Sequence, residues 1–479
     1  MKVYKLLIYL FILVALLTYI YFVEIRHKQA ESERKEKASR IVQLDKDDID
    51  EIKIKVLEGP SIDIKKSAPD KWNMVRPINV SADLRAVRNL LTAATLAQPE
   101  KVVMEKDVKW EDYGLVKPNL EISLTAPKRT VAIAFGASNP AKSSYYLKVK
   151  GDQRLFLVPD TLRISLNKTV FDLRDKSVSQ FSPDDIEKLE IIRDGRDIEL
   201  QKISGKWRMI KPSNILAKSS KIEALLRGIS GLRAKEIIDS PAAEKNAYDF
   251  ENSKNKIILY GKDFSKTFTF GALKEKKSGA NQPSDIRYLL VSGQEPVYVV
   301  DDSFFTGAKL DPDSLTDRSI VMMDPLTVQK ILFEFMGKSW EFAKTGENKW
   351  EMQQPEHRDK LDDWRISEIL WSLKDLNYKS MISPIPDDLA PYRLNMPQLT
   401  ISIYQKAAEK PVKIIIGWPP QKGDSSDQHK DNSQGTPGTP ETAYAKVDPQ
   451  IDGERAIYVL DGGFIGRLRI NLDQLGKKE

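Results

Sequence analysis

The residue types that most often carry acid–base, nucleophilic or zinc chemistry are scarce in this chain. Its 479 residues include three histidines and no cysteine, which excludes disulfides, thiolate nucleophiles and zinc–thiolate sites. His27 follows an apolar N-terminal run and His429 lies in a low-complexity stretch, so His357 alone has the sequence context of a folded domain. We therefore expect no catalytic triad, no metal site and no cofactor.

Acidic residues are abundant, but their spacing does not indicate a site. Asp45, Asp47 and Asp48 lack the central glycine and the terminal glutamate of a calcium-binding loop. No pair of acids recurs in an apolar setting that would separate two carboxyl pKa values. We predict that the protein is not an enzyme. An envelope hydrolase stays open as an alternative and would need a cleft with converging acids.

Two segments resemble a phosphate-binding loop, GASNPAKS at 136–143 and GALKEKKS at 271–278. Each lacks the second glycine of G-x-x-x-x-G-K-[ST], and each lies between predicted strands rather than before a helix. The 75 basic and 69 acidic residues are interleaved along the chain, so no single basic face is expected. We predict neither nucleotide nor nucleic acid as a partner.

The residues that do recur are packing and turn residues. The phrase K-W-x-M-x-x-P occurs at 71–77, 206–212 and 349–355, and a tyrosine and then a strand-ending glycine follow each time at nearly constant spacing. This frame indicates three tandem copies, and its tryptophans are expected to be core anchors rather than ligand platforms. The repeat signature consists of Trp72, Pro77, Tyr113, Gly136, Trp207, Pro212, Tyr248, Gly271, Trp350, Pro355, Tyr392 and Gly417.

Each copy has the same predicted order of elements. Alternating strands come first, the tryptophan strand ends at its proline, one amphipathic helix follows, and four further strands include a hairpin. Ser81, Ser219 and Asp362 are predicted helix caps. We predict an α+β fold of three homologous domains, 48–180, 181–322 and 323–479, each a mostly antiparallel sheet with one principal helix on a face.

A second phrase recurs between the copies. DKSVSQFSPDDIEKL from Asp175 matches DRSIVMMDPLTVQKI from Asp317, and nothing comparable follows the third copy. A phrase present between domains and absent after the last one indicates domain-to-domain docking, although an ordinary solvated loop is the alternative. The predicted joint residues are Asp175, Ser177, Asp317, Arg318 and Ser319.

The amino terminus carries a predicted membrane anchor. Residues 6–23 are 18 residues without a charge, long enough to cross a bilayer as a helix. No small-x-small cleavage site follows, which favours an uncleaved signal anchor over residues 1–23 rather than a removed signal peptide. Residues 24–47 are highly charged and are predicted to form a solvated tether. Basic residues flank both sides of the run, so the sidedness of the bulk stays open, with an extracytoplasmic location expected.

The loop after the strand glycine differs most between copies. In the third copy it is a low-complexity run over 419–442, rich in Gly, Pro, Ser and Asp. Such a composition cannot bury a core. We interpret it as a tolerated insertion, with a partner-binding arm as the alternative.

Together these phrases resemble a known family. The tryptophan phrase, Tyr113-Gly-Leu, the strand ending at Gly136, the hairpin at Tyr145 and the phrase Leu173-Arg-Asp-Lys-Ser are similar to the family called domain of unknown function 4340. The resemblance implies a bacterial envelope protein, often found beside an ABC-type transport system similar to the one associated with gliding motility, and it brings no catalytic residues.

We therefore expect a non-enzymatic, single-pass protein of the cytoplasmic membrane that serves as an accessory or scaffold of an envelope complex. The alternative is an extracytoplasmic module that binds glycan or peptide. Trp364 and Trp371 could serve such a module, because they lie seven residues apart on one helix face. The same spacing would suit two core residues.

Overall fold

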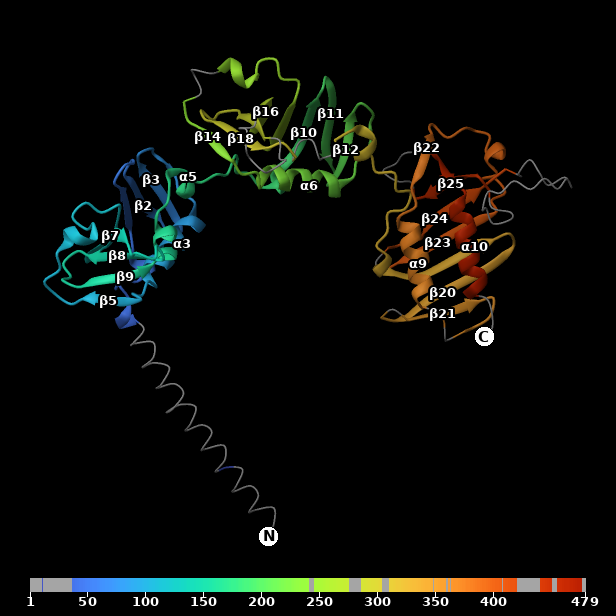
Figure 1. Ribbon diagram of the computed structural model, residues 1–479. Helices are drawn as coiled ribbons and strands as arrows, with labels where there is room; N and C mark the ends of the chain where they lie inside the picture. Colours follow the sequence, from blue (N-terminus) through green and yellow to red (C-terminus); the bar gives the residue numbers. More distant parts are fainter. Residues whose placement is uncertain are drawn as a thin grey trace, which may run out of the picture. The chain divides into compact units, whose positions relative to one another are not determined.

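Three antiparallel sheets make up most of this computed structural model (Figure 1). The structure describes residues 11, 37–240, 245–274, 286–303, 310–347, 349–358, 361, 363–406, 408–419, 440–449 and 455–475. The sheets contain nine, nine and eight strands, and they fit three repeated β-rich domains. We call the segments that carry them copy 1, copy 2 and copy 3.

In copy 1 the strand order is β4-β3-β2-β1-β6-β7-β8-β9-β5. The central pair β1–β6 is antiparallel, with Ile52 opposite Leu124 and Ile54 opposite Ile122. All four side chains are buried, as the alternation of apolar and polar residues requires of a sheet with one covered face. The strands are β1 (Glu51–Val56), β2 (Ile62–Ala68), β3 (Lys71–Arg76), β4 (Val80–Ser81), β5 (Lys101–Met104), β6 (Leu120–Ala126), β7 (Arg129–Ser138), β8 (Ser144–Val149) and β9 (Leu155–Pro159).

Copy 2 repeats that order as β13-β12-β11-β10-β15-β16-β17-β18-β14. Copy 3 has the order β21-β20-β19-β23-β24-β25-β26-β22. In the place of β4 and β13 its described residues form an isolated bridge between Met352 and Arg358. The strands of copy 2 are β10 (Ile186–Arg193), β11 (Arg196–Ile203), β12 (Lys206–Lys211), β13 (Ile215–Leu216), β14 (Glu236–Ile238), β15 (Lys256–Gly261), β16 (Ser265–Leu273), β17 (Ile286–Val291) and β18 (Val297–Asp301). Those of copy 3 are β19 (Val328–Phe335), β20 (Lys338–Gly346), β21 (Lys349–Gln354), β22 (Tyr378–Ile382), β23 (Leu399–Gln405), β24 (Val412–Gly417), β25 (Thr442–Asp448) and β26 (Ile457–Asp461).

One twelve-residue helix belongs to each copy: α3 (Leu84–Thr95), α6 (Ser219–Ser230) and α9 (Asp363–Lys374). Its apolar residues recur at helical spacing, so one face is buried against the sheet. Shorter elements are α4 (Asp160–Leu166), α5 (Val170–Leu173), α8 (Pro312–Leu315), η2 (Lys46–Asp48), η3 (Trp110–Tyr113), η4 (Pro183–Asp185), η6 (Lys245–Tyr248), η7 (Pro325–Thr327) and η8 (Ala390–Tyr392).

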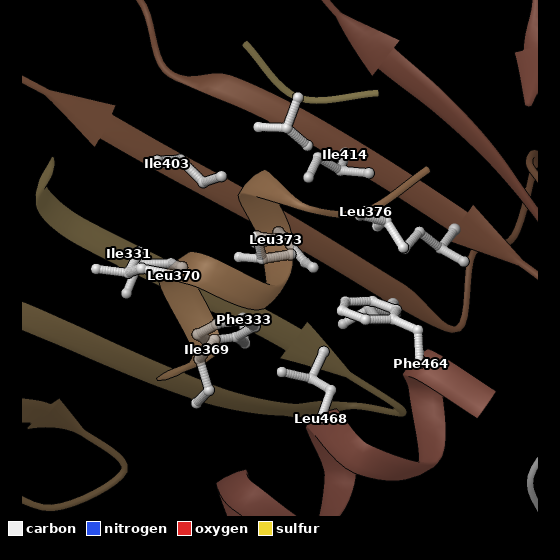
Figure 2. Packing of buried hydrophobic residues seen from close by; sticks show 14 of the residues in the cluster. Ile331, Phe333, Ile369, Leu370, Leu373, Leu376, Ile403, Ile414, Phe464 and Leu468 are labelled. Carbon is white, nitrogen blue, oxygen red and sulfur yellow. The ribbon is translucent and has the colours of Figure 1, made fainter. Parts of the chain in front are cut away.

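Copy 3 has a second long helix that the sequence analysis did not predict. The segment after its last strand forms α10 (Gly463–Leu475). Phe464 and Leu468 of α10 join Leu370 and Leu373 of α9 and strand residues such as Phe333 in one buried cluster, and Figure 2 shows these side chains converging. The expectation of one principal helix per copy is therefore wrong for copy 3.

The helix caps were only partly predicted. Asp83, rather than Ser81, caps α3, because its Oδ1 accepts hydrogen bonds from the amides of Arg85 and Ala86. Ser219 is the first residue of α6 instead of its cap. Asp362 lies outside the described residues.

The predicted tether ends earlier than residue 47. Ile41 and Val42 are buried in the core of copy 1, and the Ile41 amide donates to the Ala97 carbonyl at 2.9 Å. The last part of the segment 24–47 therefore belongs to the fold, because two adjacent apolar side chains gain by leaving water.

The predicted membrane anchor, residues 1–23, lies outside the described residues apart from position 11, as does most of the tether. Within the described ranges, no helix combines the length and apolar character needed to cross a bilayer. Residues 420–439 of the low-complexity run likewise lie outside the described residues.

By its internal contacts the chain forms two compact units, one from 1–197 with 223–309 and one from 198–222 with 310–479. The predicted domain limits stay a prediction. Between the sheets of copies 1 and 2 the limit at 180/181 falls after β9 and before β10, and the limit at 322/323 falls after β18 and before β19.

Candidate functional site

The tryptophan phrase forms the same strand in all three copies. Trp72, Trp207 and Trp350 are each no more than 5% exposed, and the methionine two residues later, Met74, Met209 and Met352, is fully buried. The strands β3, β12 and β21 end one residue before Pro77, Pro212 and Pro355, and each proline follows a cis peptide bond. The phrase therefore supplies core residues and the end of a strand, not a ligand platform.

The signature tyrosine and glycine touch each other. A Cβ built on Gly136 would lie 2.1 Å from the carbonyl oxygen of Tyr113, and one on Gly271 would lie 2.1 Å from that of Tyr248. For Gly417 the distance to the Tyr392 carbonyl oxygen is 2.5 Å. No side chain fits in that space, because real Cβ contacts do not fall below about 3 Å. Glycine recurs at this position so that the tyrosine turn can close on the strand.

A second tyrosine completes this arrangement in every copy. The rings of Tyr113 and Tyr146 meet edge to face with centroids 4.7 Å apart, and Tyr248 meets Tyr288 in the same way at 4.7 Å. Tyr392 and Tyr444 form the third pair at 5.0 Å. The hairpin tyrosine of copy 1 is thus Tyr146, not Tyr145 as the resemblance suggested. Tyr145 lies under the Arg163 guanidinium instead.

The residue after the tyrosine adopts a left-handed conformation in all three copies. Gly114 has φ 67°, Asp249 has φ 54° and Arg393 has φ 57°. Glycine accepts this conformation without cost, whereas an arginine does not. Copy 3 therefore carries backbone strain that copy 1 avoids.

The joint between copies 1 and 2 is an extended segment that makes isolated β-bridges to both copies, and we call it the shared strand. Its first half pairs with the entrance to α3, where the Asp83 amide donates to the Leu173 carbonyl and the Asp175 amide to the Ser81 carbonyl. Its second half pairs with the exit from α6, where the Val178 amide donates to the Leu232 carbonyl. The segment 173–178 therefore has backbone partners in both copies.

The joint before copy 3 repeats these hydrogen bonds. The Asp317 amide donates to the Leu216 carbonyl at the entrance to α6, and the Ile320 amide donates to the Leu376 carbonyl at the exit from α9. Bridges pair Ala217 with Thr316 and Ser319 with Asn377. The recurring phrase found in the sequence is thus this shared strand.

The second half of the same joint also precedes copy 1, which the sequence analysis missed. The Ile41 amide donates to the Ala97 carbonyl at the exit from α3, the position that Val178 and Ile320 hold at the later joints. Each of these residues is followed, at equal spacing, by a 3-10 turn, η2, η4 or η7. The ungapped match of IVQLDKDDI at 41–49 with VSQFSPDDI at 178–186 was the available signal.

The aspartates among the predicted joint residues make their side-chain hydrogen bonds to amides of the same segment. Asp175 Oδ1 accepts from the Ser177 amide at 2.9 Å, and Asp317 Oδ1 accepts from the Ser319 amide at 3.0 Å. These bonds are turns of the Asx type. The Arg318 side chain pairs with Asp313, five residues earlier. All five predicted joint residues lie in the joint segments, and the side-chain bonds of Asp175, Asp317 and Arg318 described here are local in sequence.

Two ion pairs that were not predicted cross the first joint. Arg174, only 8% exposed, places Nη1 2.8 Å from Asp239 of copy 2. Arg233 of copy 2 pairs with Asp83, the cap of α3. Burial disfavours the ionised form of Asp83, but the Ala86 amide and Arg233 outweigh it and hold the pKa of that carboxyl below its ordinary value.

The equivalent positions of the second joint do not carry opposite charges that could pair in this way. Thr316 takes the place of Arg174, and Lys218 and Asn377 take the places of Asp83 and Arg233, as the matching bridges and hydrogen bonds define them. The two joints therefore share their backbone geometry and differ in electrostatics.

Two large aromatic rings are exposed on α9. Trp364 is 58% exposed and Trp371 is 46% exposed. The Arg365 guanidinium lies 4.4 Å from the ring centroid of Trp364, and the Lys374 ammonium lies 4.6 Å from that of Trp371. Of the two interpretations of this pair, core or surface, the structure supports the surface.

Among the hollows formed by the described residues, two lie in the compact unit made of 1–197 and 223–309. The larger, about 600 Å3, lies between the segment before copy 1 and the C-terminal end of α3. The smaller, about 420 Å3, lies at the first joint beside Asp83 and Arg233. Within the described part of the chain no three His, Asp or Glu side chains gather as metal ligands would, and the hollow at the joint is lined by the paired charges already described.

The model of one protein family matches this chain twice. The family is described as Domain of unknown function (DUF4340), and its matches cover residues 72–253 and 207–397, together more than half of the chain. The chain belongs to the DUF4340 family. Both matches begin at a signature tryptophan and end just past the signature tyrosine of the following copy. The DUF4340 model thus includes the shared strand of a joint, not only the sheet of one copy.

Other comparisons add little to this. No curated protein matches the sequence of this DUF4340 member. Among solved structures, it is compared with a DnaN sliding clamp (DNA polymerase III subunit beta) from Pseudomonas aeruginosa bound to griselimycin, at 8% identity over 88% of this chain and 92% of that one, with a TM-score of 0.14. A TM-score this low does not support a shared fold or function.

Proposed function

We propose that this protein is a non-enzymatic scaffold or accessory subunit of a cell-envelope complex, anchored in the cytoplasmic membrane by residues 1–23. The observation that carries the proposal is the shared strand. The same backbone hydrogen bonds recur at both joints between copies, and the signature residues serve packing and turns. A chain of linked copies with no catalytic set predicted suits holding other proteins in place.

The proposed partner is a membrane complex of ABC-transporter type. The family resemblance is the source of this part of the proposal, together with the apolar N-terminal run. An anchored scaffold would bind such a complex with its bulk outside the cytoplasm.

Two measurements test the proposal. A reporter that is active only outside the cytoplasm, fused after Glu479, should be active. Purification of the full chain from gently solubilised membranes should recover both the ATPase and the membrane-spanning subunits of one transporter. Recovery of neither subunit, with the chain itself intact and folded, would count against the scaffold.

A second candidate function is an extracytoplasmic module that binds glycan or peptide. The exposure of Trp364 and Trp371 favours it, since large rings in water are typical of binding surfaces. Isothermal titration of the full chain with cell-wall glycan fragments would test it. Heat that disappears when both tryptophans are replaced would support the glycan module.

A further inference from the structure

The helix α9 has a core face and an unusual solvent face. Ile366, Ile369, Leu370 and Leu373 are buried against the sheet and α10, as Figure 2 shows for the last three. Trp364 and Trp371 lie on the opposite side. Seven residues make about two turns, so the rings lie on one stripe roughly 10 Å apart. Glu368, also exposed, lies on that stripe between them. We call Trp364, Glu368 and Trp371 the outer stripe of α9.

The other two copies show that the fold does not require these rings. The buried residue Ile366 corresponds to Val87 of α3 and Ile222 of α6 by the shared spacing of core residues. The positions of Trp364 and Trp371 then correspond to Arg85 and Thr92 in copy 1 and to Ser220 and Arg227 in copy 2. All four of these residues are polar and exposed. The same helix therefore packs in the same way with polar residues at both places, and the two tryptophans of copy 3 need another explanation.

Charges around the stripe restrict what can cover it. Arg365 and Lys374 stack on the two rings, and their positions on the helix place them on opposite sides of the stripe. Along the helix the outer stripe presents an aromatic ring, then a carboxylate, then a second aromatic ring. A complementary surface would offer apolar contacts to the rings, a basic group to Glu368 and acidic groups to the flanks.

Two possible occupants fit this pattern poorly. The surface of an anionic bilayer would attract Arg365 and Lys374 but repel the carboxylates of Glu368 and Asp375, so these four charges give it no net attraction. A second copy of the chain, packed antiparallel through a two-fold axis near the centre of the stripe, would place Glu368 against its own equivalent. An amphipathic helix from a different protein has neither problem, and it can present residues one heptad apart to two rings one heptad apart.

We propose that the outer stripe of α9 docks an amphipathic helix of a partner protein, whose two apolar residues one heptad apart contact Trp364 and Trp371 and whose basic residue between them pairs with Glu368. This rests on the proposed scaffold function and names the surface that would hold the partner. Tryptophans buried at the centre of an interface contribute much of its binding energy, so the two exposed rings would be the main contacts of the docked helix.

The test places a photo-crosslinking amino acid at Ser372, exposed beside Trp371, in the full chain in its native membranes. The expected result is one protein adduct, whose crosslinked peptide contains a basic residue flanked by apolar residues at heptad spacing. Replacing both rings by the copy 2 residues, Trp364→Ser with Trp371→Arg, should lower the adduct yield roughly tenfold or more. Glu368→Lys should lower it as well, and Glu368→Gln less.

Matched controls separate binding from folding. Met396→Ser removes another highly exposed apolar side chain of copy 3, 73% exposed, outside α9, and should leave the adduct unchanged. Thermal unfolding of the double tryptophan variant should match that of the parent, because both rings are exposed. An adduct that survives the double replacement would overturn the proposal, as would an adduct with lipid, with glycan or with a second copy of the chain. If transporter subunits co-purify while the adduct is absent, the docking proposal fails and the scaffold stands.

Discussion

Replacing Gly136 by alanine should destabilise copy 1 strongly. The added Cβ would lie 2.1 Å from the Tyr113 carbonyl oxygen and 2.9 Å from Leu115 Cγ. The first contact is with backbone, which cannot rotate away, so the turn η3 must move off β7. Overpacking of this kind costs about 1–3 kcal/mol. Loss of the edge-to-face contact between Tyr113 and Tyr146 adds about 0.5–1.5 kcal/mol. Together these contributions predict a loss of about 1.5–4.5 kcal/mol.

Two other glycines of copy 1 provide controls. Gly151 has φ 87° with nothing within 4 Å of the added Cβ, so Gly151→Ala should cost only the left-handed conformation, about 1 kcal/mol. For Gly59 the nearest atom would be the Val56 Cβ at 3.6 Å, an ordinary contact. Gly59→Ala should therefore have almost no effect.

Native-state hydrogen exchange on the full chain can measure the loss of stability of copy 1 in each of these variants. The free energy of opening of the β7 amides should fall most in Gly136→Ala, less in Gly151→Ala and least in Gly59→Ala. If Gly136→Ala costs no more than Gly151→Ala, the close approach of the tyrosine turn does not explain the recurring glycine.

Two further predictions concern the left-handed residue and the first joint. Arg393→Gly should stabilise copy 3 by about 0.5–1 kcal/mol, because glycine accepts φ 57° freely, while Arg393→Ala should give no gain; hydrogen exchange in β23 and β24 would show both. The pKa of Asp83 is lowered in the folded chain, so its contribution is present above the ordinary value of 3.8 and is lost as the pH falls through the folded value. Asp83→Asn keeps an N-cap but loses the ion pair with Arg233, whose side chain is half exposed, so it should lower the stability by at most about 1 kcal/mol. Hydrogen exchange at the amides of residues 232–234 should then depend less on acid pH in the variant than in the parent. Equal dependence in both proteins would contradict the assignment of the lowered pKa to this ion pair.

The repeated residues allowed the sequence to predict the sheets well. Tryptophan, proline and glycine each impose a local requirement, burial, a strand end or a close approach, and that requirement is the same in every copy. Their spacing therefore predicted three similar β-rich domains. The reason for the glycine was not predictable, because its contact is with a carbonyl group more than twenty residues away in the sequence.

Errors arose where neighbouring residues had similar chemistry. Tyr145 and Tyr146 are adjacent, and only the pairing register of the hairpin, with Tyr146 opposite Leu157, decides which one faces Tyr113. Likewise Ser81 and Asp83 are both good helix caps. Ser81 and Asp83 both pair with the shared strand through their backbones, and Asp83 is the residue that caps α3. A shift of one residue along a strand reverses the face of its side chain, which local patterns do not reveal.

The contacts across the first joint were missed because they join distant residues. Arg174 and Asp239 are 65 residues apart in sequence, and Asp83 and Arg233 are 150 apart. Neither pair recurs at the second joint, so repetition gave no signal. The sequence also did not decide whether Trp364 and Trp371 are buried or exposed, because residues seven apart share one face of a helix and that face can be either the core face or the solvent face.

Because the strand at each joint completes two neighbouring copies, a copy is not a self-sufficient piece of chain. A fragment that stops at the edge of its last sheet strand would lose the segment that pairs with the entrance to its helix, and one that begins at its first sheet strand would leave the helix exit without a partner. Fragments that retain residues 41–178 or 176–320 keep these pairing segments at both ends. The smallest portion of this chain worth isolating is therefore a copy together with the borrowed strand on either side.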